Sequence, residues 1–307
     1  MFKMSEYSFI AGVLAVALAL GCYVVAFVSA RVTGRRVLLA GTSAGALAGA
    51  GAGGGSGGTV GLERSGSTGL GTYGTLLTYL ALTFLTASLL FRTIATGHGP
   101  FANMYEFSIA FAWGTLVMYA YFERRYHQRV LGLIALPVAL ALLLYATTIP
   151  ATIDPLVPAL QNNLLLSIHV AVAIVAYGTF TVAFAAAVLY LVQGENGRRG
   201  LPSRELLDEI SYKAVVVGFP FLTLTIVLGA VWAEVAWGTY WSWDPKETAS
   251  LVTWLIYGSY LHARVVRGWR GERAAWLLIL GFGATLFTYF GNLFFGGLHS
   301  YSGLNNQ

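Results

Sequence analysis

Aromatic side chains are concentrated in one short stretch of the chain, which reads WAEVAWGTYWSWDPKE from Trp232. Trp237 and Trp241 are four residues apart and share a helical face, with Tyr240 and Trp243 beside them. Flat rings gathered in this way suit a large, planar, apolar ligand. The alternative is an aromatic belt at a membrane interface, where Trp and Tyr are enriched. The density of tryptophan in this stretch favours a ligand surface.

The same stretch ends in the sequence of a helix start. Asp244 stands at the N-cap position, Pro245 at the first helical position and Glu247 at the third. Capping of the following helix therefore explains the two acidic residues without any ligand. Capping and a direct ligand role are compatible, so both interpretations of Asp244 and Glu247 stay open.

The composition places these residues in a membrane protein. Of the 307 residues, 57% are hydrophobic and only 10% are charged, whereas an ordinary soluble domain is about one quarter charged. Lipid must therefore solvate much of the surface. The net charge of +5 does not indicate nucleic-acid binding, because the basic residues form short clusters between apolar runs. The single cysteine, Cys22, excludes thiol–disulfide exchange between two thiols of this chain.

Apolar runs of about 20 residues predict membrane spans, and the fold class expected is an all-α, polytopic transmembrane bundle. The eight predicted spans cover residues 7–30, 74–91, 104–122, 129–148, 165–193, 212–232, 248–264 and 273–293. The chain divides into a first transmembrane helix over 1–33, a Gly-rich flexible cytoplasmic linker over 34–73, and a seven-span domain over 74–307 with an outer loop at 232–247.

The distribution of Lys and Arg predicts the orientation of the spans. Fifteen of the eighteen basic residues fall on one side: Arg31, Arg35, Arg36, Arg64, Arg124, Arg125, Arg129, Arg198, Arg199, Arg204, Lys213, Arg264, Arg267, Arg270 and Arg273. Only Lys3, Arg92 and Lys246 fall on the other. The positive-inside rule then places both termini on the outer, periplasmic side.

The aromatic stretch resembles the tryptophan-rich WWD signature of haem handling proteins, in the CcsA/ResC family of cytochrome c biogenesis membrane proteins. The matching residues are Trp237, Gly238, Tyr240, Trp241, Trp243, Asp244, Pro245, Lys246 and Glu247. The resemblance extends to Gly97, His98, Gly99, Pro100, Asn103, Tyr105 and Glu106, and to Gly297, Leu298, His299, Ser300 and Tyr301. It covers most of the chain from about residue 74, and implies that the seven-span domain handles haem.

Two histidines are expected on the same outer side as the aromatic stretch. His169 lies near the start of the fifth span, and His299 follows the eighth. Neutral imidazole is a common axial ligand of haem iron. The resemblance implies that these two residues ligate the iron of haem b as a bis-imidazole pair. The other residues expected at this site are Trp237, Tyr240, Trp241, Trp243 and Asp244.

The remaining histidines have different expected roles. His262 lies about 14 residues into the seventh span, roughly 21 Å from the outer surface. The resemblance implies that His262 binds a second haem, whose other axial ligand comes from a partner subunit. His98 also matches a family position, but its place in a loop favours an ordinary loop residue. We interpret His127 as a solvated residue of an inner basic loop.

The resemblance implies a role in system II cytochrome c maturation, as part of a holocytochrome c synthase complex that attaches haem to the CxxCH thiols of apocytochrome c. The expected partners are a ResB/CcsB-type membrane subunit, apocytochrome c, a thioredoxin-like thiol reductant and the lipid bilayer, but no nucleic acid. No acid–base pair is evident, so the work of the protein is positioning. Lys246 can pair with a haem propionate or be solvated at the interface, and its type favours solvation.

Other functional classes stay open. One is a haem chaperone or lyase subunit of the Ccm-type pathway, which shares the WWD loop; chain length and a single such loop favour system II. A non-haem membrane transporter is the other. The chain lacks paired short spans broken by Pro or Gly, which argues against a transporter. Ala- and Arg-rich composition favours a bacterial plasma membrane over a thylakoid membrane.

Overall fold

The computed structural model describes residues 1–48, 65–153, 156, 160–161, 163–195, 197–198, 200–291 and 294–299. The helices of this part are α1 (Phe2–Ala48), α2 (Ser65–Thr96), α3 (Met104–Tyr126), α4 (Gly132–Thr147), α5 (Asn163–Gln193), α6 (Arg204–Trp237), α7 (Pro245–Val266) and α8 (Glu272–Phe290). A short 3-10 helix, η1 (Arg129–Leu131), precedes α4. The described residues contain no strand, which confirms the all-α prediction.

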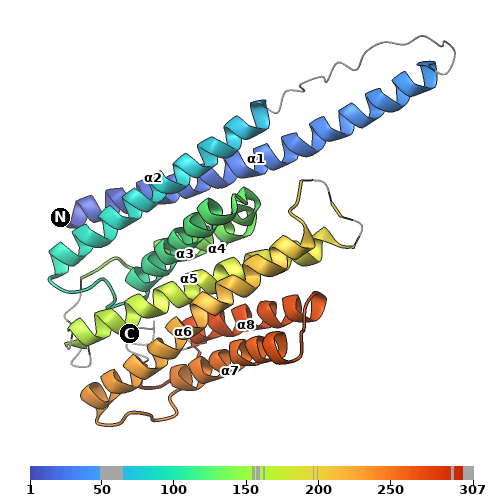
Figure 1. Cartoon of the computed structure of the whole chain (residues 1–307). Coiled ribbons are helices and arrows are strands. Elements are labelled where there is room, and N and C mark those ends of the chain that lie inside the picture. Colours follow the sequence, from blue (N-terminus) through green and yellow to red (C-terminus); the bar gives the residue numbers. More distant parts are fainter. Residues whose placement is uncertain are drawn as a thin grey trace.

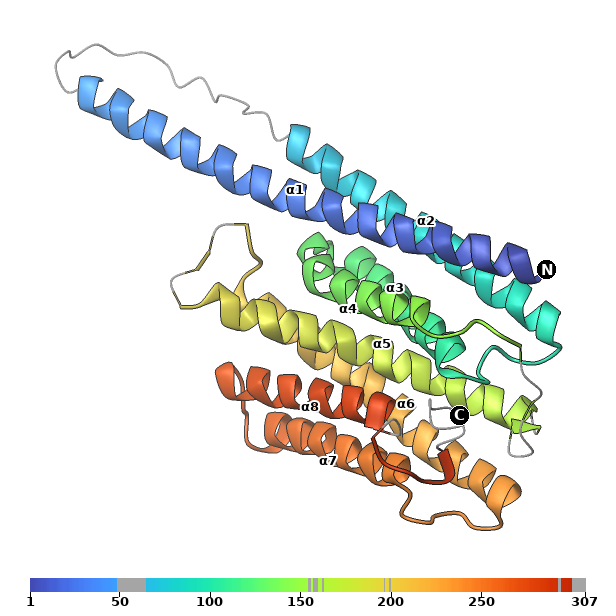
Figure 2. The ribbon, with the colours of Figure 1, turned by 180° about the vertical axis from the view of Figure 1, so that it is seen from behind.

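Consecutive helices run in opposite directions, so the chain passes back and forth along one axis (Figure 1). The long pair α1 and α2 covers one side of the bundle, and α7 and α8 close the opposite side, as the view from behind also shows (Figure 2). Between them, α5 contacts α3, α4, α6 and α8. Its most apolar window is 67% buried, against 44% or less in the other apolar helices. The central helix α5 therefore supplies a fixed wall for any site between helices.

Six helices of the described part are long and apolar enough to cross a membrane, namely α1, α2, α4, α5, α6 and α8. The chain is therefore a multi-pass membrane protein. The other two helices, α3 and α7, coincide with predicted spans but are less apolar than these six. Most of the α3 side chains are buried by neighbouring helices, which shields its polar groups from lipid. The count of eight spans and the outer placement of the termini stay predictions.

The connection between α1 and α2 is more helical than predicted. Helix α1 continues to Ala48 and α2 begins at Ser65, so helix covers 34–48 and 65–73 of the segment expected to be a flexible linker. Alanine is the strongest helix former, and the run from Gly41 to Ala48 contains no proline. The linker is thus shorter than predicted at both ends, and residues 49–64 lie outside the described part.

A buried ion pair fastens the end of the bundle where the α2–α3 and α4–α5 connections meet. Arg92 Nε lies 2.8 Å from Glu106 Oε1, and both side chains are at most 3% exposed. The Arg92 guanidinium also donates to the backbone oxygens of Ala151 (2.7 Å) and Thr152 (2.8 Å). Glu106 accepts a further hydrogen bond from the Ala102 backbone at 2.7 Å. The Arg92 guanidinium and the Glu106 carboxylate are thus paired with each other and with backbone groups of both connections. These contacts hold the α2–α3 and α4–α5 connections to α2 and α3.

Replacing Arg92 with methionine should destabilise the protein strongly, because it leaves the Glu106 carboxylate buried without its cation. A loss of about 3–5 kcal/mol in the free energy of unfolding is expected, measured by denaturant titration in detergent. Replacing both residues with methionine should cost less than Arg92→Met alone. Lys3→Met, which removes an exposed charge, serves as the control. Equal losses for Arg92→Met and Lys3→Met would show that the buried ion pair does not stabilise the fold.

Candidate functional site

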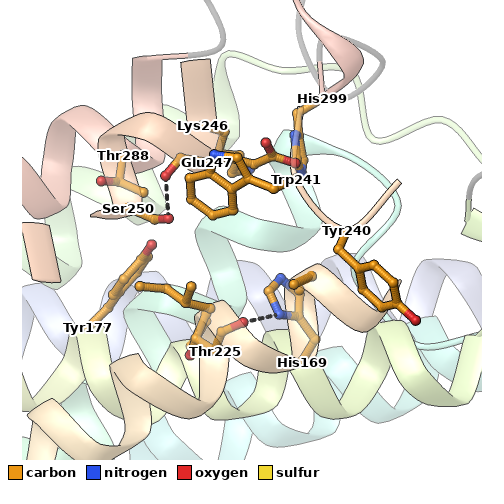
Figure 3. A pocket seen from close by; sticks show the side chains of 14 residues that line it. His169, Tyr177, Thr225, Tyr240, Trp241, Lys246, Glu247, Ser250, Thr288 and His299 are labelled. Atoms are coloured by element: carbon orange, nitrogen blue, oxygen red, sulfur yellow. Dashed lines mark hydrogen bonds between the residues drawn. The ribbon is translucent and has the colours of Figure 1, made fainter. Parts of the chain in front are cut away.

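A pocket lies where α5 and α6 face the start of α7 (Figure 3). His169 lines it from α5, and His299 lines it from the opposite side, with Tyr240 and Trp241 nearby. The structure therefore brings four of the predicted site residues around one cavity.

Helix α6 fixes the imidazole of His169. The Nδ1 atom lies 2.8 Å from the backbone oxygen of Thr225. A carbonyl can only accept, so Nδ1 carries the proton and Nε2 carries the lone pair. The ring lies directly over Gly229, where an added Cβ would be 2.8 Å from its Cε1 atom. One carbonyl and one glycine of α6 thus set both the tautomer and the position of His169.

Asp244 holds the other imidazole. Its Oδ1 atom lies 2.8 Å from His299 Nδ1, and its Oδ2 atom accepts from the His299 backbone at 3.4 Å. The same carboxylate accepts from the Lys246 backbone at 2.9 Å, and Glu247 completes the capping box at the start of α7. The predicted cap is confirmed. Asp244 therefore contacts His299, and its carboxylate acts as a support for that imidazole.

The charges of this pair follow from their surroundings. Burial lowers the pKa of His299, the hydrogen bond to Asp244 opposes that shift, and the charge of Lys246 adds to it, so the net shift is downward. Burial alone would raise the pKa of Asp244, but hydrogen bonds from His299 and from the Lys246 backbone lower it to about 2. At neutral pH Asp244 is a carboxylate and His299 a neutral imidazole protonated at Nδ1, the form in which histidines bind metals.

Two tryptophans back the imidazoles. Trp232, only 1% exposed, lies 6.4 Å from the ring of His169 and nearly parallel to it, and 5.8 Å from the ring of His299. Trp237 packs edge to face on both Trp232 (4.7 Å) and His299 (4.9 Å). Sequence reasoning missed Trp232, which closed the predicted sixth span. The sequence feature that could have identified Trp232 as part of the site is its large indole, five residues before Trp237.

The prediction that Trp237 and Trp241 share a helical face is wrong. Helix α6 ends at Trp237, and Gly238 adopts a left-handed conformation (φ 75°) as its C-cap. Trp241 therefore belongs to the loop, where it lines the pocket and packs edge to face on Trp243 at 5.7 Å. Trp243 is 69% exposed and Tyr240 59%. These two residues form the exposed edge of the site.

The remaining histidines lie away from this pocket. His262 is exposed on α7, on the helix face that also exposes Leu255 and Val266. His98 lies in the α2–α3 loop, with Nδ1 2.8 Å from the Gly99 backbone oxygen. His127 is the exposed, left-handed C-cap of α3. The described residues contain no cluster of three or more His, Cys, Asp or Glu that could hold a bare metal ion.

The fold and the site together define a helical membrane protein with two imidazoles and several aromatic side chains around one pocket near an end of its bundle. Residues 101–299 match the family described as cytochrome c assembly protein. The "Cytochrome c biogenesis protein CcsA" of Guillardia theta is 39% identical over 256 residues, which cover 74% of this chain and 85% of the relative. The chain belongs to the cytochrome c assembly protein family, as its aromatic motif predicted.

A second relative agrees with this assignment, and one solved structure shares the fold. The CcsA protein of Synechococcus elongatus is 34% identical over 290 residues, covering 77% of this chain and 88% of the relative. The solved structure of "Cytochrome c Heme Lyase CcmF" aligns with a TM-score of 0.60 at 19% identity, covering 94% of this chain. The alignment covers 46% of CcmF, so this chain spans less than half of that protein's length. This last likeness shows a shared fold.

Asp244→Ala should destabilise the protein more than the loss of a helix cap alone. Ser203→Ala is the matched control, because Ser203 caps α6 through Leu206 and has no imidazole partner among the described residues. That control should lose about 1 kcal/mol of unfolding free energy. Asp244→Ala should lose about 1.5–3 kcal/mol more, because the hydrogen bond to His299 also disappears. Equal losses, measured by denaturant titration, would show that Asp244 acts only as a cap.

Proposed function

We propose that this chain binds haem b between His169 and His299 and presents it for covalent attachment to the CxxCH thiols of apocytochrome c, in system II cytochrome c maturation. The observation that carries this proposal is the pair of imidazoles on opposite sides of one pocket. Each has its Nδ1 occupied by an acceptor, so that Nε2 is the ligating nitrogen. Two such nitrogens are the axial set of a bis-imidazole haem.

The residues of the pocket fit the haem cargo. Porphyrin nitrogens supply the equatorial ligands of the iron, so two imidazoles complete its coordination without any third protein ligand. The indoles of Trp232 and Trp237 back the imidazoles, and Trp241 offers a further aromatic surface inside the pocket. The hydrogen bonds to Thr225 and Asp244 orient the imidazoles before a ligand arrives. Such preorganisation lowers the entropic cost of binding.

The chain contributes positioning to the attachment reaction. Each thioether forms when a cysteine sulfur of the apocytochrome bonds to one vinyl carbon and the hydrogen goes to the neighbouring carbon, with no net oxidation. Tyr240 and Trp243 leave one edge of the site exposed, where the thiols approach. A thioredoxin-like reductant keeps the cysteines reduced. The histidine of CxxCH then displaces one axial imidazole and releases the product.

The proposal also covers the membrane topology and a second haem site. Eight spans cross the plasma membrane with both termini outside, and the seven spans from residue 74 onward form the haem-handling domain with its outer loop at 232–247. His262 is exposed on α7, which supports binding of a second haem shared with another chain. We assign that chain to the ResB/CcsB-type subunit, since a haem at His262 needs a second axial ligand.

The fold likeness to CcmF favours a second candidate, a haem lyase subunit of the Ccm-type pathway. Relatives named CcsA at 34–39% identity favour system II. Co-purification of the chain with its partner distinguishes the two proposed functions, because the system II proposal requires a ResB/CcsB-type subunit. Haem staining of the purified protein separates both from a non-haem transporter.

His169→Ala and His299→Ala should each abolish the bis-imidazole spectrum of the outer haem, because either variant removes one axial nitrogen. The measurement is the optical spectrum of the protein co-purified with its partner, with and without reductant, together with the haem content. His127→Asn is the control, because asparagine tolerates the left-handed conformation at that exposed cap. If both alanine variants kept the haem content and spectrum of the wild type, the site assignment would be wrong.

Gly229→Ala should weaken haem binding without touching a ligand. The added methyl group would lie 2.8 Å from His169 Cε1, so the imidazole must move away from the Thr225 carbonyl. Overpacking of this kind costs about 1–3 kcal/mol, and haem affinity should fall by about tenfold or more. Gly283→Ala on α8 is the control, since no atom lies within contact distance of its added Cβ. Equal haem affinities of the two variants would exclude this role of Gly229.

A further inference from the structure

We propose that Lys246 binds a propionate carboxylate of the haem and thereby determines which edge of the ring faces out of the pocket. This inference rests on the proposed function. Lys246 lies in the first turn of α7 and lines the same pocket as both imidazoles. Its Nζ atom lies 5.4 Å from the ring centroid of Phe107 on α3. The ammonium group therefore lies close to α3, and Lys246 is partly buried.

The charge of Lys246 has no acidic counterpart in the described part of the chain, where no carboxylate lies within ion-pair distance of Nζ. The two acidic neighbours are engaged elsewhere. Asp244 accepts from His299 and from the Lys246 backbone, and Glu247 accepts from Ser242 and from the Asp244 backbone. A partly buried ammonium group on the wall of a ligand pocket favours an anionic ligand group.

Arg92, another basic residue expected on the outer side, does not compete for this role. Its guanidinium is neutralised by Glu106 and donates to two backbone oxygens. Lys3 is exposed near the start of α1 and does not line the pocket. Lys246 is therefore the cation that the pocket offers to an acidic ligand.

The two ends of the pocket differ in chemistry. Tyr240 lies at one end, while Ser250, Thr288 and Tyr177 lie at the other (Figure 3), and Lys246 also lines the pocket. Haem carries its two propionates on one edge and its vinyl groups toward the opposite edge. With the propionates near Lys246 and the hydroxyl groups, the vinyl edge faces Tyr240, where the site is exposed. Lys246 thus contributes to presenting the vinyl groups to the thiols.

The test compares haem with its dimethyl ester, in which the carboxylates are uncharged while the iron and vinyl groups are unchanged. Both are titrated into the haem-depleted wild-type protein with its partner and into Lys246→Met, Lys246→Arg and Lys3→Met. The wild type and Lys3→Met should bind haem about tenfold or more tightly than the ester, as expected for a charge-assisted contact. Lys246→Met should bind both about equally, and Lys246→Arg should restore the preference.

The bis-imidazole spectrum of the bound haem should be the same in all these variants, because Lys246 is not an iron ligand. An equal loss of affinity for haem and ester in Lys246→Met would assign a merely structural role to the lysine and overturn the inference. An unchanged preference in that variant would overturn it as well. If the wild type bound neither compound, the proposed function itself would fail.

Discussion

The Asp244 carboxylate receives hydrogen bonds from the first turn of α7 and from His299, so one side chain ties the position of a helix to the orientation of an imidazole. Gly297 allows this contact, because an added Cβ there would collide with Asp244 Oδ2. The segment after α8 therefore returns onto the start of α7. Without this carboxylate, His299 would lack the acceptor that fixes its tautomer, and one wall of the pocket would lose its oriented imidazole.

The opposite wall is built by packing between long helices. Thr225 and Gly229 on α6 hold His169 on α5, the central helix of the bundle, by a backbone hydrogen bond and by close approach. One imidazole thus depends on helix–helix contact and the other on a capped loop. Both are oriented in the protein itself, so the cost of ordering them is met on folding, before the ligand binds. The fold alone therefore orients both imidazoles of the pocket.

Local sequence signals predicted local features well. The capping residues at 244–247 were identified because an N-cap depends on a few adjacent residues, and apolar runs located the helices. The prediction that Trp237 and Trp241 share a helical face was wrong because Gly238, which ends the helix, lies between them. Trp232 and Gly229 were missed because their roles arise from contacts between α5 and α6, which no spacing within one segment reveals. Similarly, the Arg92–Glu106 pair joins residues on different helices.

Hydrogen bonds also hold the exposed edge of the site. Trp243 adopts a left-handed backbone conformation (φ 60°), which is costly for a bulky residue. The Glu247 carboxylate accepts from the Ser242 backbone on one side of Trp243 and from the Asp244 backbone on the other. These two hydrogen bonds constrain the turn and maintain the strained residue with its indole outward. In the proposed function, such an edge would keep a bound ring in one orientation while a second protein approaches, which a mobile loop would not do.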